Sequence, residues 1–432
     1  MIWLYRIVSL PFLLFSIPYY LGRMLRRGGY SKGWPQRFGF FEKLPQQSSL
    51  NLKKRIWIQA VSVGEVLAME PLIQKLNASE YTDIILTTTT STGYREALRR
   101  YGDSVLSVGL FPLDLLPCSA LAWRRIKPDL IVLAEGELWP EHIHRAQGQD
   151  VPIFLINGRL SDKTFNRFKH LPQATQWLLP KINSIYCSSK QDFERFKILG
   201  VSPETSVGNL KLDVSLLDTL PKEARIEKLE AIGFRQVASE VPFILIGAST
   251  WEGEELLLLK IQNQLLKAGI DCHLILVPRH AERCASLKKL LQAQPLDWNC
   301  ASSGVATDQP LKIHLSDTTG HLKELLALAD IAFIGKSLDP HKGGQTPIES
   351  AGLGIPSIFG PNMSNFKSIT RELIQAGASI EVPSEAMLST EILKLAKDPS
   401  ERMAMREAGR KWLDQNKGIS TLIAEAIFKA LR

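Results

Sequence analysis

The amino-acid sequence predicts an α/β protein of two domains, each built on a parallel sheet. Short apolar runs rich in β-branched residues alternate with helical stretches, which is the pattern of strands buried on both faces. The chain has 432 residues, of which 45% are hydrophobic and 22% charged, and this length exceeds one ordinary domain. We divide it into an N-terminal segment (1–28), a first domain (29–218), a linker (219–240), a second domain (241–400) and C-terminal helices that pack back (401–432).

The N-terminal segment is apolar and is followed by a basic cluster, Arg23 to Arg27. Residues 1–40 contain six Lys and Arg and no acid, so most of the formal net charge of +8 lies there. This pattern favours an anionic membrane surface as partner, and not nucleic acid. Because Arg6, Pro11 and Pro18 argue against a full span, we expect a helix that lies in the inner leaflet, with the body in the cytoplasm. The alternative is a buried helix of a soluble domain. Five scattered cysteines indicate a reducing compartment.

Five strands are expected in the first domain, and polar or small residues follow four of them. The strands are Trp57–Val61, Ile84–Thr88, Leu130–Ala134, Ile153–Ile156 and Ile185–Cys187. Because the carboxyl ends of parallel strands share one edge of the sheet, the residues that follow them can form one site.

Glu65 lies where the first strand gives way to a predicted helix over Val66–Leu76, which contains Pro71. A carboxylate near a helix N-terminus is stabilised by the helix dipole and by free N–H groups. Glu65 is therefore either a capping residue, the commoner role for an isolated Glu, or a catalytic carboxylate.

Further candidates in this domain follow the later strands. Glu135 and Glu137 flank Gly136, and they either support a catalytic charge or act as acids at a helix N-terminus. Arg159 and Ser161 could bind an anion, although Ser161 could simply cap the next helix. In a separate loop, Lys211 could hold a phosphate or a carboxylate, or be a surface lysine.

The second domain begins at the strand Phe243–Gly247. After it, Ser249 and Glu252 fit a capping box, and the same turn could accept a phosphate. Arg279 follows the next strand, and its planar guanidinium suits a nucleotide phosphate. Residues 318–322 open a helix whose backbone N–H groups are available, and Glu349 could hold the two hydroxyls of a ribose. We find no metal-binding spacing and expect no metal and no cofactor.

Several short motifs stand in a fixed order through nearly the whole chain. They are Ser62–Glu65, Glu137–Pro140, Arg159–Ser161, Lys211–Asp213, Pro278–His280 and Asn365–Lys367. Together they resemble the Kdo transferases, membrane-associated enzymes that add 3-deoxy-D-manno-octulosonic acid (Kdo) to lipid A. The resemblance implies a GT-B fold, in which two Rossmann-like domains face each other across a cleft.

The resemblance also implies an activity: inverting, metal-independent transfer of Kdo from CMP-Kdo to a lipid A precursor (lipid IVA) at the inner membrane. The residue that matches Glu65 is the base that takes the acceptor's proton, and those that match Glu135 and Lys211 stabilise the transition state. The implied CMP site consists of Pro278, Arg279, Gly320, His321, Leu322, Thr346, Pro347, Ile348 and Glu349.

Two departures from the family pattern concern the donor side. Gln345 and Thr346 replace a usual His-Asn pair, and Lys336 stands before Ser337 where a glycine is usual. Two other functions remain open. One is a GT-B glycosyltransferase that acts on a lipid with another nucleotide sugar, which donor identity would distinguish. The other is a membrane-attached nucleotide-binding module without catalysis, which would bind CMP without turnover.

Overall fold

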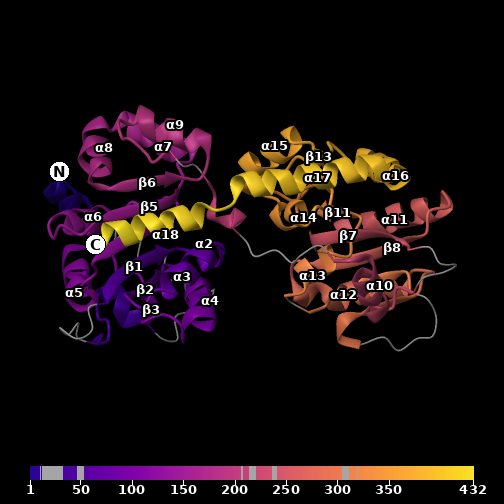
Figure 1. Ribbon diagram of the computed structural model, residues 1–432, viewed down its shortest axis with the longest axis horizontal. Coiled ribbons are helices and arrows are strands. Elements are labelled where there is room, and N and C mark those ends of the chain that lie inside the picture. The colour runs from indigo at the N-terminus through magenta and orange to yellow at the C-terminus, as the bar shows by residue number, and fades with distance from the viewer. Residues whose placement is uncertain are drawn as a thin grey trace. The chain divides into compact units, whose positions relative to one another are not determined.

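The computed structural model describes residues 1–9, 11, 33–45, 53–205, 208–213, 220–235, 241–303, 311–318 and 320–432. The chain divides into two compact units, Met1–Val214 with Asn416–Arg432, and Ser215–Gln415. Each unit contains one parallel sheet (Figure 1). The α/β class with two parallel sheets is therefore confirmed.

The sheet of the first unit has six parallel strands in the order β3-β2-β1-β4-β5-β6. They are β1 (Lys54–Ala60), β2 (Thr82–Thr88), β3 (Ser107–Leu110), β4 (Leu130–Ala134), β5 (Ile153–Gly158) and β6 (Ser184–Cys187). The strand order reverses between β1 and β4, because β2 pairs with one side of β1 and β4 with the other. At such a switch point the loops after the two strands diverge, and ligands bind in the crevice between them.

Helices cover both faces of this sheet. They are α2 (Val63–Ala68), α3 (Glu70–Asn77), α4 (Ser91–Tyr101), α5 (Leu116–Ile126), α6 (Pro140–Gln147), α7 (Asp162–His170), α8 (Pro172–Leu178), α9 (Lys190–Ile198) and α18 (Ile419–Ala430), with 3-10 turns η1 (Trp34–Phe38), η2 (Leu179–Lys181) and η3 (Leu210–Leu212). Alternate residues of β1 enter opposite core layers: Ile58 packs with Ile423 of α18, and Trp57 packs with Trp123 of α5. Burying such a side chain contributes about 2 kcal/mol.

The sheet of the second unit has seven parallel strands in the order β13-β12-β11-β7-β8-β10-β9. They are β7 (Phe243–Thr250), β8 (Cys272–Pro278), β9 (Trp298–Cys300), β10 (Ile313–Leu315), β11 (Ile331–Ile334), β12 (Ser357–Phe359) and β13 (Ser379–Glu381). Here the order reverses between β7 and β11, since β8 pairs with the other side of β7. The loops after β7 and β11 therefore form the switch point of this unit.

The helices of the second unit end with a long one that precedes α18. They are α10 (Lys222–Ala231), α11 (Glu254–Lys267), α12 (Cys284–Gln292), α13 (Leu322–Leu326), α14 (Ile348–Leu353), α15 (Lys367–Gln375), α16 (Glu385–Lys397) and α17 (Pro399–Asn416), with 3-10 turns η4 (Ala281–Arg283), η5 (Ala301–Ser303) and η6 (Ser364–Phe366). The chain then returns to the first unit as α18 (Figure 1), where Asp213 accepts the backbone N–H groups of Gly418 and Ser420.

Two expectations about secondary structure are corrected. The single helix expected over Val66–Leu76 is two helices, α2 and α3, which meet at Met69. Pro71 is the second residue of α3, where a missing N–H costs nothing, whereas inside one helix it would break a hydrogen bond. The short strands β3, β9, β10 and β13, none longer than four residues, were not expected, because they lack a long apolar run.

The N-terminal segment is described in part. Residues 2–9 are helical, and the rest of the expected membrane-associated segment 1–28, including Arg23 to Arg27, lies outside the described residues apart from positions 1 and 11. No helix among the described residues is long and apolar enough to cross a bilayer.

Candidate active site

The first unit gathers three glutamates at its switch point. Glu65 follows β1, and Glu135 and Glu137 follow β4, the strand paired with β1. Their electrostatic influence on one another is visible in their pKa values, since Glu135 raises the pKa of Glu65, and Glu65 raises that of Glu137. The prediction that strand ends would bring these residues together is confirmed for this group.

Glu65 is the third residue of α2 and is buried. Its Oε2 accepts the backbone N–H of Val61 at 2.8 Å, and its Oε1 accepts the hydroxyl of Ser62 at 3.0 Å. The capping role that the sequence left open is therefore present. Burial raises the pKa of Glu65 above its ordinary value, and Glu135 raises it further. The two hydrogen bonds and Lys211 pull it back down. A desolvated carboxylate of this kind is a stronger base than one in water.

Glu135 is held against Lys211 from the η3 turn. Lys211 Nζ lies 3.0 Å from Glu135 Oε1, and both side chains are partly exposed. Glu135 has a left-handed backbone with φ 54°, a conformation that costs energy for a residue with a Cβ and that clusters at functional sites. Asn157, also left-handed with φ 53°, fixes the η3 turn by accepting the N–H of Leu210 at 3.2 Å. Asn157 thus fixes the turn from which Lys211 forms its ion pair with Glu135.

Glu137 was predicted, with Glu135, either to support a catalytic charge or to be an acid at a helix N-terminus, but the residues that hold it were not predicted. Its Oε2 accepts the indole N–H of Trp139 at 2.7 Å and the amide of Gln59 at 3.4 Å. Gln59 is fully buried on β1 and also donates to Thr89 at 2.9 Å. Burial raises the pKa of Glu137 to about 7, and Glu65 adds to the rise. A polar Gln inside an apolar strand was the signal that could have revealed this support.

Ser161 and Arg159 make different kinds of contact. The Ser161 hydroxyl accepts the backbone N–H of Thr164 at 3.2 Å and caps α7, which is the structural alternative noted for it. Arg159 is exposed, and its backbone N–H donates to the Glu135 carbonyl at 3.2 Å. Arg159 therefore ties the loop after β5 to the loop that carries Glu135.

The N-terminal helix docks beside the glutamate loop through contacts that the sequence did not reveal. Arg6 makes two hydrogen bonds of 2.9 Å to the fully buried carboxylate of Glu141, the second residue of α6. Tyr5 donates to Asp114 at 2.6 Å, and Asp114 in turn accepts the backbone N–H of Glu141 at 3.2 Å. Burial raises the pKa of Asp114 to about 6. The same helix leaves Trp3 exposed, so it is anchored on one face only.

In the second unit, Pro278 and Arg279 end β8. The Arg279 N–H donates to the carbonyl of Thr250 at 3.1 Å, which joins the exits of β7 and β8. The Arg279 side chain is exposed and forms no ion pair with any residue that the structure describes. A free guanidinium at a strand exit is suited to an oxyanion.

The other two predicted CMP-binding segments open the short helices α13 and α14. Gly320, with φ 102°, precedes His321 and Leu322, and His321 Nδ1 lies 2.9 Å from Glu324 Oε2. Pro347 is the N-cap residue of α14, and Thr346 Oγ1 accepts the N–H of Ile348, the first residue of this helix, at 3.2 Å. These segments follow different strands of the same sheet, and α13 contacts α14.

Glu349 has a buried carboxylate oxygen that a ligand could hydrogen-bond. Its side chain is half-buried as a whole, but its Oε2 atom is shielded from solvent and has no partner among the described residues. Burial raises the pKa of this carboxyl. Buried polar atoms almost always have a hydrogen-bond partner, so an orphaned acceptor marks a place for a donor.

The turn after β7 differs from the expected capping box. Ser249 belongs to β7 and Gly253 is the N-cap of α11, so Ser249 and Glu252 do not form the box. Instead Glu254 accepts the N–H groups of Trp251 at 2.8 Å, Lys336 at 2.9 Å and Ser337 at 3.2 Å. The protein's own carboxylate takes these donors, so the turn cannot bind a phosphate through them.

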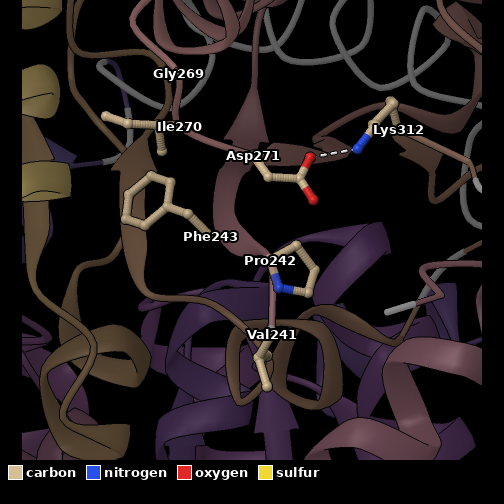
Figure 2. A pocket seen from close by; sticks show the side chains of 7 residues that line it. All are labelled: Val241, Pro242, Phe243, Gly269, Ile270, Asp271 and Lys312. Carbon is tan, nitrogen blue, oxygen red and sulfur yellow. Dashed lines mark hydrogen bonds and ion pairs between the residues drawn. The ribbon is translucent and has the colours of Figure 1, made fainter. Parts of the chain in front are cut away.

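A pocket of about 490 Å³ lies at the opposite edge of this sheet (Figure 2). Phe243 and Asp271 stand at or before the amino ends of β7 and β8, and Asp271 pairs with Lys312. This edge is remote from the strand exits, and its lysine is already paired within the pocket. We therefore place the candidate site at the carboxyl ends of the strands and not in this pocket.

Comparisons with known proteins agree on one family. The family model described as 3-deoxy-D-manno-octulosonic-acid transferase (kdotransferase) matches residues 32–214. The 3-deoxy-D-manno-octulosonic acid transferase of Bordetella pertussis is 30% identical over 94% of this chain and 94% of its own. The enzyme of the same name from Haemophilus influenzae is 31% identical over 90% of this chain and 89% of its own.

Solved structures add information on the fold alone. HepE from Anabaena, in complex with UDP, has a TM-score of 0.57 at 14% identity and covers 88% of this chain and 99% of its own. MurG of Acinetobacter baumannii has a TM-score of 0.53 at 12% identity, covering 87% and 99%. The two parallel-sheet units therefore have the GT-B glycosyltransferase architecture.

Proposed function

This chain belongs to the family of 3-deoxy-D-manno-octulosonic acid (Kdo) transferases, and we propose that it transfers Kdo from CMP-Kdo to the lipid A precursor lipid IVA. Family membership makes it a glycosyltransferase that transfers Kdo in lipopolysaccharide biosynthesis. The observation that carries the proposal is the arrangement at the first switch point, where a buried Glu65 of raised pKa lies near the Glu135–Lys211 ion pair.

In the proposed reaction, the acceptor hydroxyl oxygen attacks the anomeric carbon of Kdo from the face opposite CMP. The bond from that carbon to the phosphate oxygen breaks, and CMP leaves with the bonding electrons, so the configuration inverts. Glu65 takes the proton of the hydroxyl. Its raised pKa suits this task, because a base whose pKa lies nearer the working pH drives proton transfer better.

The transition state carries positive charge on the sugar and negative charge on the leaving phosphate. We assign the sugar side to Glu135, a carboxylate that Lys211 holds in place at 3.0 Å. We assign the phosphate side to Arg279, whose guanidinium has no ion-pair partner among the described residues. A cation that neutralises the leaving group takes over the task of a metal, so the proposed mechanism is metal-independent.

The CMP site proposed for the second unit also includes Gly320–Leu322 and Thr346–Glu349. The segments that open α13 and α14 follow β10 and β11, so they lie at the same sheet edge as Arg279, and backbone N–H groups left free there would suit an anion. Glu349 would accept the hydroxyls of the ribose, which would satisfy its orphaned Oε2. Gln345 and Thr346, in place of His and Asn, still supply hydrogen-bond donors.

We further propose that the N-terminal helix lies on the cytoplasmic face of the inner membrane. Its Trp3, Leu4, Ile7 and Val8 side chains are 58–69% exposed, while Tyr5 and Arg6 are tied to the first unit. Apolar residues on the free side of an anchored helix would enter the lipid headgroup region. The basic cluster Arg23–Arg27 supplies the charge that anionic lipid attracts.

The function is tested by incubating the whole protein with CMP-Kdo and tetraacylated lipid A precursor in detergent, with mass spectrometry of the lipid. We expect one or more Kdo residues on the acceptor, and none when UDP sugars replace CMP-Kdo. A lipid product with a UDP sugar instead would favour the second glycosyltransferase hypothesis. Tight CMP binding with no product from any donor would contradict the proposal and favour a nucleotide-binding module.

A further inference from the structure

Lys336 has a backbone conformation that glycine adopts more easily. It follows β11 with φ 60°, in the left-handed region that is unfavourable for a residue with a Cβ. The surroundings impose this conformation. The Lys336 N–H donates to Glu254 at 2.9 Å, its carbonyl accepts the N–H of Gly344 at 3.1 Å, and a Cβ at Gly335 would come within 2.3 Å of the Ser249 carbonyl. A strained residue held so firmly at a strand exit points to a role for its side chain.

The side chain of Lys336 lies over an aromatic ring. Its Nζ is 4.4 Å from the ring centroid of Trp251, which follows β7. The Trp251 ring is in turn 5.1 Å from the ring of His280, next to Arg279, and 5.5 Å from that of His341. The Lys336 ammonium is thereby placed at the switch point between β7 and β11, close to the end of β8.

Lys336 also borders the segment proposed to hold the ribose. Gly344 donates to the Lys336 carbonyl at 3.1 Å, and Gln345 donates to that of Gly335 at 3.1 Å. The loop that leads to Thr346 and Glu349 therefore runs alongside Lys336. Lys336 thus adjoins two of the three segments of the proposed CMP site, the one with Arg279 and the one with Thr346 and Glu349.

The acids close to Lys336 do not neutralise its charge. Glu254 is buried and accepts three backbone N–H groups, and Glu255 is paired with Arg283 at 2.8 and 3.0 Å. The Lys336 ammonium forms no ion pair with any residue in the described part of the chain. It is therefore a free cation at a sheet edge where ligands bind, supported by a tryptophan.

We propose that Lys336 binds the carboxylate of the sugar acid that is transferred, and so adds in this chain to the donor recognition that family members with a glycine here achieve without it. The inference rests on the proposed function, because a CMP-linked 2-keto sugar acid carries two anionic groups, a phosphate and a carboxylate on the anomeric carbon. The planar fork of Arg279 matches phosphate geometry, whereas a lysine is a point charge that suits a single carboxylate oxygen. A neutral hexose on a nucleotide would leave Lys336 unpaired.

Lys336→Gly and Lys336→Met separate charge from backbone strain. Glycine removes both, whereas methionine keeps the strain and the contact with Trp251 but removes the charge. We expect both variants to raise the KM for CMP-Kdo about tenfold or more and to change the Kd for CMP by less than about twofold. Glycine should keep or raise the melting temperature, and Lys336→Arg should retain most of the affinity for CMP-Kdo.

Three outcomes would overturn or replace this assignment. Unchanged KM for CMP-Kdo in both Lys336→Gly and Lys336→Met would overturn it. An equal loss of CMP and CMP-Kdo affinity would overturn the carboxylate as the ligand and assign Lys336 to the phosphate. If the wild-type protein binds CMP but does not use CMP-Kdo, the proposed function fails, and that failure is seen without any variant.

Discussion

The two units share one architecture, yet the residues at their switch points carry opposite charge. In the first unit, Glu65, Glu135 and Glu137 gather with Lys211 as the neighbouring cation. In the second unit, Arg279 and Lys336 have no acidic partner among the described residues. The same strand-to-loop geometry therefore presents a cluster of carboxylates in one unit, where we propose the proton acceptor, and unpaired cations in the other, where we propose anion binding.

The contrast has a physical origin in how each unit treats its acids. At the turn after β7 in the second unit, Glu254 accepts backbone N–H groups and Glu255 binds Arg283, so these two acids are satisfied without Arg279 or Lys336. The glutamates of the first unit are desolvated and repel one another, so the pKa values of Glu65 and Glu137 rise. Because Glu254 and Glu255 are already bonded, Arg279 and Lys336 keep their charges available, whereas the raised pKa of Glu65 suits this carboxylate to accept a proton. Fold alone thus does not decide the chemistry.

Replacing Glu65, the proposed base, should give the largest effect. We expect Glu65→Gln to lower kcat by about 10²- to 10⁴-fold, the usual contribution of a general base, with CMP affinity unchanged because the proposed CMP residues belong to the second unit. Steady-state transfer kinetics and calorimetric titration with CMP would measure both. Ser62→Ala provides a graded companion: since the Ser62 hydroxyl lowers the pKa of Glu65, its loss should move the acidic limb of the rate profile to higher pH.

If Glu65→Gln retained more than a tenth of the wild-type turnover, Glu65 would not be the base. A parallel loss of CMP affinity in Glu65→Gln would show that the acidic cluster and the CMP site are not separable, and the comparison between the two units would then fail.

Neutralising Glu137 should change how the free energy of unfolding depends on pH, because the pKa of this carboxyl is raised in the folded protein. The folded pKa of about 7 exceeds the unfolded value of 4.5, so the folded state holds the extra proton between these values. The free energy of unfolding therefore falls as the pH rises through this window. Glu137→Gln should gain up to about 3 kcal/mol over the wild type at pH 8, and little at pH 4, measured by urea unfolding.

The buried histidines do not disturb this test. Burial lowers the pKa of His142 to about 3 and that of His273 to about 4, which makes stability fall at acidic pH, but these groups are common to both proteins. Glu137→Asp keeps an ionisable carboxyl and should retain a pH-dependent loss. A difference between Glu137→Gln and the wild type that stays constant from pH 4 to 8 would contradict the assignment of the raised pKa.

The smallest expected effect concerns Glu349 of the second unit, whose Oε2 has no partner among the described residues. Glu349→Gln should weaken CMP binding about tenfold, as expected when a charged acceptor for ribose hydroxyls is lost. Because burial raises the pKa of Glu349, the same variant should have a higher melting temperature at pH 8 without ligand. Calorimetric titration and thermal unfolding would measure the pair of changes. Full CMP affinity in Glu349→Gln would remove this residue from the proposed site.

Several features were predictable because a local pattern carries them. Leu130–Ala134 has the same bounds in the sequence prediction and in the structure, since a continuous apolar run between polar ends leaves little choice. Glu65 was placed at a strand-to-helix junction for the same reason. The break at Met69 was missed because a helix tolerates Pro in its first turn, and the sequence does not say where a first turn begins.

Other features depend on residues that are far apart in the chain. Arg6 reaches Glu141, and Gln59 reaches Glu137, through contacts that no local spacing encodes. Glu254, not Glu252, took the donors at the turn after β7, because two of those donors belong to the exit of β11. Such partners become visible only when the sheet order is known.

The sequence by itself determined that this chain has two parallel-sheet units, which strand exits carry polar residues, and which family it belongs to, because apolar runs and ordered motifs are local properties. Tertiary structure decided which of those exits meet at a switch point. It also decided that Glu65 lies buried among other acids and that Lys336 remains a strained, unneutralised cation above Trp251. Desolvation, charge pairing and backbone strain depend on which residues lie close together in space, and only the folded structure determines this.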